Sequence, residues 1–126
     1  MPKILIIDDD TQLCAALRVR LEKQNYDVLT ASNGADGLDL AKQESPQLIV
    51  LDLAMPDIDG LQILGYLKHQ ATTSDIPVLV VTARGQIGDH ERAMLMGATR
   101  FLLKPLSLYD FVFEISHLLA TTSPTS

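Results

Sequence analysis

The chain has 126 residues, of which 47% are hydrophobic and 21% charged, and its formal net charge is −6 at pH 7. This size and composition predict one soluble globular domain with a sizeable core, and the acidic balance argues against direct nucleic-acid binding. A single cysteine, Cys14, permits no internal disulfide, and no apolar run reaches the roughly 20 residues of a membrane span, so we expect a cytoplasmic protein without membrane contact.

Five short apolar runs recur along the chain, at residues 4–7, 28–30, 48–51, 78–81 and 101–103. The runs are mostly continuous rather than alternating, which is typical of strands covered on both faces, as in a parallel sheet. The segments between them show the helical spacing of apolar residues. The chain is about half as long as a closed eight-fold barrel requires. The pattern therefore predicts an α/β fold in which five βα units form an open, doubly wound, five-stranded parallel sheet.

Polar residues and glycines mark where the expected helices begin and end. Asp10 is interpreted as the N-cap of the first helix, Asp59 as the N-cap of the third, and Ser107 as the N-cap of the last. Gly97 is expected to end the fourth helix. We predict one domain over residues 1–120, followed at residues 121–126 by a flexible tail or the start of a linker.

Charged and polar residues follow four of the five expected strands. They are Asp8, Asp9, Asp52, Thr82 and Lys104. Ligands of open parallel sheets bind at the carboxyl ends of the strands, beside the point where the strand order reverses. Three carboxylates there need a cation between them, and Mg²⁺ prefers such oxygen ligands. One carboxylate would then attack a phosphoryl group, with Lys104 neutralising the transferring oxygens and Thr82 donating a hydrogen bond.

With these residues the chain resembles the receiver domain of two-component response regulators. The matching motifs are the acidic pair Asp8-Asp9, then Asp52 followed by Met55-Pro56 and Gly60, then Thr82-Ala83, and finally Lys104-Pro105. Any one motif is common, but four in order at matching strand ends are specific. The resemblance covers about residues 3–120 and implies the flavodoxin-like receiver architecture.

The resemblance also implies the chemistry of the site. Asp52 would accept a phosphoryl group from a phosphohistidine on a partner, either a sensor histidine kinase or a phosphotransfer protein. Asp9, Asp52 and the backbone carbonyl of Ala54 would bind Mg²⁺ directly, and Asp8 would bind it through water. Lys104 would pair with Asp52, and the Lys104–Pro105 peptide bond would be cis. The domain would be no enzyme beyond its own phosphotransfer and dephosphorylation.

A conformational switch is a further implication of the resemblance. Thr82 would shift towards the phosphoryl group, and Phe101 would move inward. The face made by the fourth helix, the fifth strand and the fifth helix would then change shape. Through this face the domain would control a downstream protein or an output domain, or form a homodimer on phosphorylation.

Two residues beside the expected site bear on how long the phosphoryl group persists. Ala54, two residues after Asp52, offers no polar side chain to orient an attacking water. Arg84, two residues after Thr82, is expected to cover part of the phosphoryl group. We therefore hypothesise slow self-dephosphorylation, with a lifetime of minutes or more.

Three other hypotheses account for part of the same pattern. A haloacid-dehalogenase-like phosphatase also uses an aspartate after its first strand, but its Asp-x-Asp-x-Thr/Val signature would need the hydroxyl one place later than Thr11. A flavodoxin-like electron carrier needs a phosphate loop where this chain has three carboxylates, which would repel a phosphate. A degenerate receiver that serves only for docking is argued against by the presence of every expected site residue.

Overall fold

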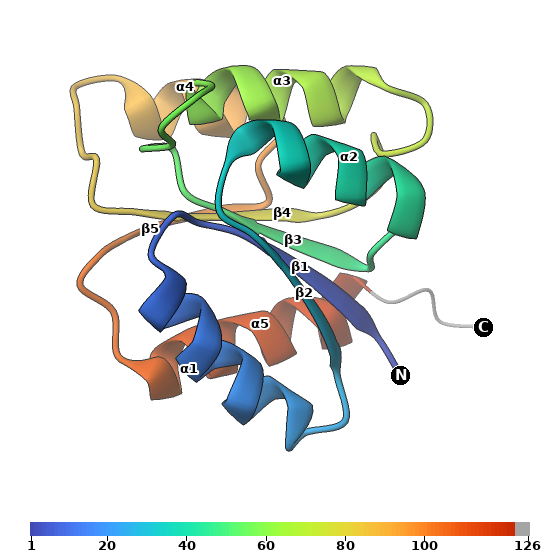
Figure 1. Cartoon of the computed structure of the whole chain (residues 1–126). Helices are drawn as coiled ribbons and strands as arrows, with labels where there is room; N and C mark the ends of the chain where they lie inside the picture. Colours follow the sequence, from blue (N-terminus) through green and yellow to red (C-terminus); the bar gives the residue numbers. More distant parts are fainter. Residues whose placement is uncertain (123–126) are drawn as a thin grey trace.

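A five-stranded parallel sheet lies between two layers of helices in the computed structural model, which describes residues 1–122 (Figure 1). In chain order the elements are β1 (Lys3–Ile7), α1 (Thr11–Glu22), β2 (Asp27–Ala31), α2 (Gly34–Glu44), β3 (Leu48–Leu51), α3 (Gly60–His69), β4 (Val78–Thr82), α4 (Asp89–Leu95), β5 (Arg100–Leu103) and α5 (Leu108–Thr122). Each of the five apolar runs is a strand. The predicted doubly wound βα fold is confirmed.

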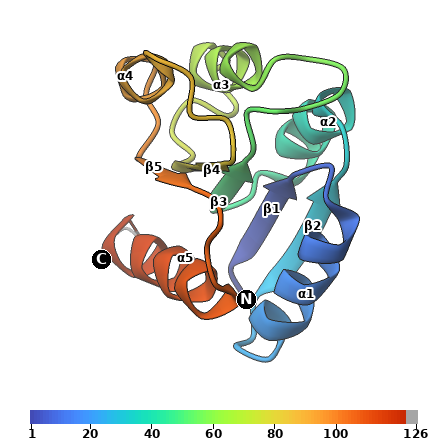
Figure 2. The same cartoon turned by 90° about the vertical axis from the view of Figure 1, so that its left-hand side faces the viewer.

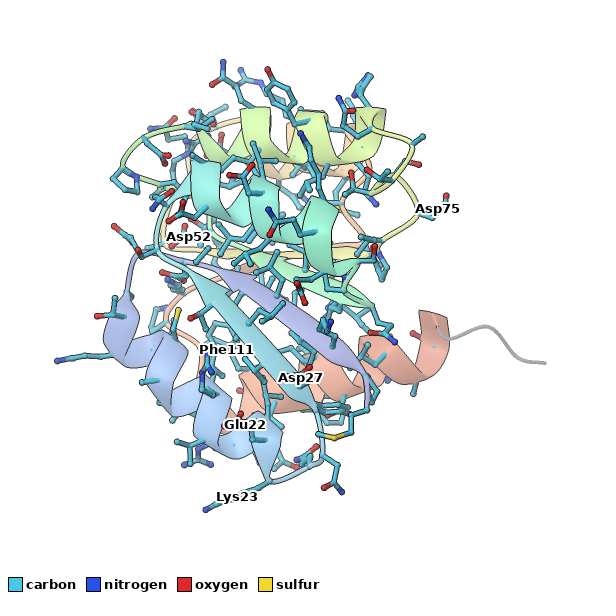
Figure 3. All side chains as sticks on the ribbon, turned by 45° about the vertical axis from the view of Figure 1, so that its right-hand side comes forward. Glu22, Lys23, Asp27, Asp52, Asp75 and Phe111 are labelled. Carbon is cyan, nitrogen blue, oxygen red and sulfur yellow. The ribbon has the colours of Figure 1, made fainter. Side chains whose placement is uncertain are left out.

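The two faces of the sheet carry separate hydrophobic cores. Helices α1 and α5 cover one face, and α2, α3 and α4 cover the other (Figure 2). Ile4 and Ile6 of β1 belong to the first core, in which Phe111 of α5 is also buried (Figure 3), whereas Leu5 and Ile7 belong to the second. Since successive side chains of a strand point to opposite faces, burial of both faces explains why the strands are apolar without alternation.

The strand order β2-β1-β3-β4-β5 places the reversal between β1 and β3. Ile7 of β1 is paired with Leu51 of β3, so the residues that follow them, Asp8 and Asp52, emerge side by side. In Figure 3, Asp52 lies at the opposite end of the sheet from Asp27, which begins β2. The topology alone therefore brings two carboxylates together at the usual ligand position of this architecture.

The predicted helix ends are confirmed where the structure describes them. The Asp10 side chain accepts a hydrogen bond from the backbone of α1, Asp59 does the same for α3, and Ser107 does so for α5. Gly97 follows α4 with a φ of 106°, a left-handed conformation that favours glycine. Helix α5 reaches Thr122, the last described residue and two residues past the predicted boundary, and the rest of the predicted tail lies outside the described residues. Within residues 1–122 no helix combines the length and apolar character needed to cross a membrane.

Candidate phosphoryl-acceptor site

Four charged side chains meet at the carboxyl ends of β1, β3 and β5, and we call them the acceptor cluster: Asp8, Asp9, Asp52 and Lys104. The Lys104 Nζ atom donates hydrogen bonds to Asp8 Oδ2 at 2.8 Å and to Asp52 Oδ2 at 3.0 Å. Asp8 and Asp52 are buried, whereas Asp9 is exposed. The predicted convergence of these residues is confirmed, and the Lys104–Pro105 peptide bond is cis as expected.

Donors surround both oxygens of the Asp52 carboxylate. The Thr82 hydroxyl donates to Asp52 Oδ1 at 2.6 Å, and the backbone N–H of Ala54 donates to the same oxygen at 2.9 Å. Lys104 contacts the other oxygen, Oδ2. Because Thr82 ends β4, while Ala54 and Lys104 follow β3 and β5, hydrogen bonds to Asp52 join the ends of these three strands.

The acceptor cluster has more negative than positive charge. One oxygen from each of Asp8, Asp9 and Asp52 lies within 4.8 Å of the others, while Lys104 is the one cation that the cluster contains. Burial raises the pKa of the Asp8 carboxyl, although the hydrogen bond from Lys104 opposes this shift. Burial alone would lower the pKa of Lys104, but its hydrogen bonds to Asp8 and Asp52 outweigh burial and raise it. Three carboxylate oxygens at this spacing fit a hard divalent cation.

A second ion-pair cluster lies beside the first, and we call its residues, Asp59, Arg84 and Asp89, the Arg84 clasp. Arg84 Nη1 pairs with Asp59 Oδ2 at 2.9 Å, and Arg84 Nε pairs with Asp89 Oδ2 at 3.0 Å. The guanidinium thus bridges the N-cap of α3 to the first residue of α4. Hydrogen bonds from Arg84 hold the pKa values of both carboxyls below the usual range. Arg84, expected from the sequence to cover a phosphoryl group, has its side chain engaged by these two carboxylates instead.

The loop between β3 and α3 is fixed at two further points. Gly60 packs so tightly on the backbone of Leu53 that a Cβ at this position would overlap it, and the Gly60 N–H donates to the Leu53 carbonyl at 2.9 Å. The Asp57 carboxylate accepts hydrogen bonds from the backbone N–H groups of Gly34 and Ala35 at the start of α2, at 2.7 and 3.0 Å. The loop that carries Ala54 past Asp52 is therefore anchored to two helices.

Phe101 is the one predicted site residue that the structure places apart from the acceptor cluster. Its half-buried ring packs in the core on the α2, α3 and α4 side, 5.1 Å from the ring of His90 in α4. Sequence reasoning did not find Asp89, which is 1% exposed yet charged. An aspartate in the first turn of a helix is expected at the surface, and its pairing with Arg84 depends on how two loops fold, so no local signal indicated its burial.

The comparison with protein families gives a direct assignment, because the model of the response regulator receiver domain matches residues 4–115. This chain belongs to the response regulator receiver domain family. The receiver domain is 41% identical over 122 residues to the DNA-binding dual master transcriptional regulator RpaA of Synechocystis sp., covering 97% of this chain and 51% of that protein. It is 38% identical over 120 residues to protein PilH of Pseudomonas aeruginosa, covering 95% of this chain and 99% of that protein.

Solved structures agree with the family assignment. A putative response regulator from Chloroflexus aurantiacus superposes on the receiver domain with a TM-score of 0.84 at 28% identity, covering 95% of this chain and 99% of that one. A receiver domain protein from Methanospirillum hungatei superposes with a TM-score of 0.90, covering 97% of this chain and 96% of that one, and at 24% identity it supports the fold alone.

The family is therefore established, and with it the place of the receiver domain in two-component signalling. Response regulators act with histidine kinases and with output domains. The chain spans about half the length of several curated relatives that it matches, although it spans nearly all of PilH. Membership decides against the phosphatase and electron-carrier hypotheses, since neither belongs to this family.

Proposed function

We propose that this receiver domain accepts a phosphoryl group on Asp52 from a phosphohistidine of a sensor histidine kinase or phosphotransfer protein. The single observation that supports this most strongly is the Asp52 carboxylate itself, which is buried and contacted by donors at both oxygens. A carboxylate oxygen attacks phosphorus, the P–N bond to the donor imidazole breaks, and an acyl phosphate forms. The leaving imidazole takes a proton from solvent.

The neighbours of Asp52 would stabilise the charge of the transferring group. The Lys104 ammonium lies where it can pair with a phosphoryl oxygen, and the Thr82 hydroxyl lies where it can donate to another. Mg²⁺, when bound by Asp9, Asp52 and the Ala54 carbonyl, with Asp8 holding it through water, would supply the remaining positive charge. The fit of Asp8, Asp9 and Asp52 to a divalent cation supports this part of the proposal.

Phosphorylation would change the face formed by α4, β5 and α5. A phosphoryl group adds a charge of about −1.5 to −2 beside Thr82, whose hydroxyl already contacts Asp52, so this residue needs only a small shift. Phe101 would move inward from its contact with His90 and so alter the packing between β5 and α4. Leu95 and Leu103 are exposed on these two elements and offer an apolar surface to a partner.

The consequence would be control of a downstream protein, of an output domain, or of a homodimer formed on phosphorylation. RpaA is by its name a DNA-binding regulator, and this chain matches about half of it. We infer that any DNA contact belongs to another part of such a protein, because this chain has a net charge of −6. The free, buried thiol of Cys14 agrees with the cytoplasmic location that we propose.

Labelling with acetyl phosphate and Mg²⁺ tests the proposal. We expect one acid-labile phosphoryl group per chain, located at Asp52 by mass spectrometry and absent from an Asp52→Asn variant. Asp10→Asn is the matched control, because Asp10 caps α1 and asparagine is an equally good cap. Unchanged labelling of Asp52→Asn, or modification at Asp8 instead, would overturn the proposal.

A further inference from the structure

The Arg84 clasp is connected to the acceptor cluster through the backbone of Arg84. The Arg84 N–H donates to Thr82 Oγ1 at 3.1 Å, and the Thr82 hydroxyl in turn donates to Asp52 Oδ1 at 2.6 Å. A continuous series of hydrogen bonds thus runs from the guanidinium, through the main chain of the same residue, to the proposed phosphoryl acceptor. The orientation of the Thr82 hydroxyl depends on where the backbone of Arg84 lies.

The side chain of Arg84 fixes that backbone from two directions. Besides its two shortest contacts, Arg84 Nη2 lies 3.4 Å from Asp59 Oδ1 and 3.3 Å from Asp89 Oδ1, so each carboxylate is held through both oxygens. Asp89 also accepts the N–H of Gln86, which belongs to the same loop as Arg84. A planar guanidinium held by two carboxylates in this way restricts the loop far more than a single surface ion pair does.

The two carboxylates that hold Arg84 lie at the starts of two different helices. Asp59 caps α3 and lies at the end of the loop after Asp52, whereas Asp89 begins α4. Asp89 is 1% exposed, and the side chain of Arg84 is 18% exposed. The clasp therefore joins the loop after β3 to the loop after β4, and these are the two loops on either side of the Asp52–Thr82 hydrogen bond.

We propose that Arg84 is a positioning residue for phosphoryl acceptance. Its side chain clasps Asp59 and Asp89, and its amide thereby keeps the Thr82 hydroxyl on Asp52, ready to donate to the incoming phosphoryl oxygens. The inference rests on the proposed function of Asp52. It assigns Arg84 no contact with the phosphoryl group.

Initial rates of labelling at saturating acetyl phosphate and Mg²⁺ test the inference in the full chain. Thr82→Val removes the hydroxyl, and we expect it to slow labelling roughly tenfold or more, as for a lost hydrogen bond to a charged group. Arg84→Met should also slow labelling, by a factor somewhat smaller than that for Thr82→Val. The decisive variant combines both substitutions. It should label no more slowly than Thr82→Val alone, because Arg84 can no longer act through a hydroxyl that is absent.

Two single-residue variants keep the test independent of any folding defect in Arg84→Met. Asp59→Asn keeps the cap of α3 but removes one charge of the clasp, and its side chain is half exposed. It should slow labelling in the same direction by a smaller factor, about twofold to threefold, and Arg84→Lys should restore part of the rate lost in Arg84→Met. Glu44→Gln is the matched control, since it removes the carboxylate charge of a surface ion pair with Lys3, at the opposite end of β1 from Asp8. It should label at the rate of the unchanged chain.

The outcomes separate this inference from the function on which it rests. No labelling of the unchanged chain would overturn the proposed function, and the inference with it. Normal labelling of the unchanged chain, with Asp59→Asn and Arg84→Met equally fast, would overturn the inference alone. So would a double variant in which the losses from Thr82→Val and Arg84→Met multiply, because the two residues would then act independently.

Discussion

The acceptor cluster and the Arg84 clasp are neighbours at one edge of the sheet, and each holds a single cation between carboxylates. In the acceptor cluster the cation is the point charge of Lys104, which faces three carboxylates. In the clasp it is a planar guanidinium that faces two carboxylates and holds each through both oxygens. The first cluster therefore has two negative charges in excess and unused acceptor capacity, whereas the second has one in excess and both oxygens of each carboxylate bonded to the guanidinium.

This difference indicates what each cluster is suited for. Unbalanced buried charge costs stability, and it is kept where a further cation or a reacting group has to bind. A fully paired guanidinium has no further partner to recruit, and it fixes the backbone on both sides. A cation between carboxylates is thus suited to binding a further ion in the acceptor cluster and to joining two loops in the Arg84 clasp.

The largest expected effect concerns dependence on a divalent cation. Chelation of Mg²⁺ should reduce labelling of Asp52 about a hundredfold or more, because a metal ion contributes several kcal/mol to the stabilisation of the transferring group. The chain should stay folded without Mg²⁺, as thermal unfolding would show, since the clasp needs no metal. Labelling that persists unchanged in the chelator would show that Lys104 alone compensates the charge, and the proposed metal site would then be wrong.

Removal of the clasp should cost more stability than removal of a surface ion pair. Arg84→Met leaves Asp89 buried without its cation, and we expect a loss of about 2 to 4 kcal/mol in the free energy of unfolding. Arg100→Met, which breaks the exposed pair of Arg100 with Glu114, should cost less than about 1 kcal/mol. Urea unfolding of both variants makes the comparison, and equal losses would mean that the clasp contributes no more than a surface pair.

Competition between Lys104 and the metal gives a sharper contrast. Lys104→Met should raise the affinity of the acceptor cluster for Mg²⁺ about tenfold, because an ammonium between Asp8 and Asp52 repels a second cation. Arg84→Met should change this affinity far less, since Arg84 pairs with Asp59 and Asp89 and contacts none of the proposed metal ligands. Titration of Mg²⁺ by calorimetry measures both, and an equal rise in the two variants would contradict the distinction between the clusters.

The next prediction concerns the lifetime of the phosphoryl group on Asp52. Ala54 presents no polar side chain beside Asp52, so we expect the acyl phosphate to last minutes or more after removal of the donor. Ala54→Asn adds an amide that can orient water and should shorten the lifetime about threefold to tenfold, within the usual range for positioning a reactant. Because Ala54 is exposed, the substitution should be tolerated. A lifetime of seconds in the unchanged chain would rule out the hypothesis.

The acceptor cluster could be predicted from the sequence because topology places it. Asp8, Asp52 and Lys104 each follow an apolar strand directly, and in a parallel sheet such residues meet at one edge whatever their loops do. The strands themselves were predictable for a related reason, since burial on both faces leaves β3 wholly apolar and leaves β1 apolar from Ile4 to Ile7, after the partly buried Lys3 at its start.

The Arg84 clasp could not be predicted in this way. Its residues lie in loops or at helix starts, where small changes of backbone angle move a side chain by several ångströms. Arg84 was expected to cover part of the phosphoryl group, and in the structure its guanidinium is held by Asp59 and Asp89. No local signal predicts the contact of Asp57 either, because its carboxylate accepts hydrogen bonds from backbone N–H groups at the start of α2, more than 20 residues earlier in the chain.

The smallest expected effect is the pH dependence of the clasp. Hydrogen bonds from Arg84 lower the pKa of Asp59 in the folded chain, so the ionised pair stabilises the fold above the ordinary aspartate pKa of about 4. That contribution should be lost as the pH falls below about 4. Since Asp59 is half exposed, the gap in unfolding free energy between the unchanged chain and Asp59→Asn should be under about 1 kcal/mol at pH 7.

The difference in unfolding free energy between the unchanged chain and Asp59→Asn can be measured by urea unfolding at pH 7, 5 and 3, and the Arg84→Met variant provides its control. In the Arg84→Met background the cation that lowers the pKa of Asp59 is absent, so Asp59→Asn should produce little pH-dependent gap there. A gap that persists without Arg84 would mean that capping of α3 by Asp59, not the ion pair, supplies the stability. In that case only the pair of Arg84 with Asp89 would contribute to stability, and the clasp would fix the loop after β4 to α4 without linking it to α3.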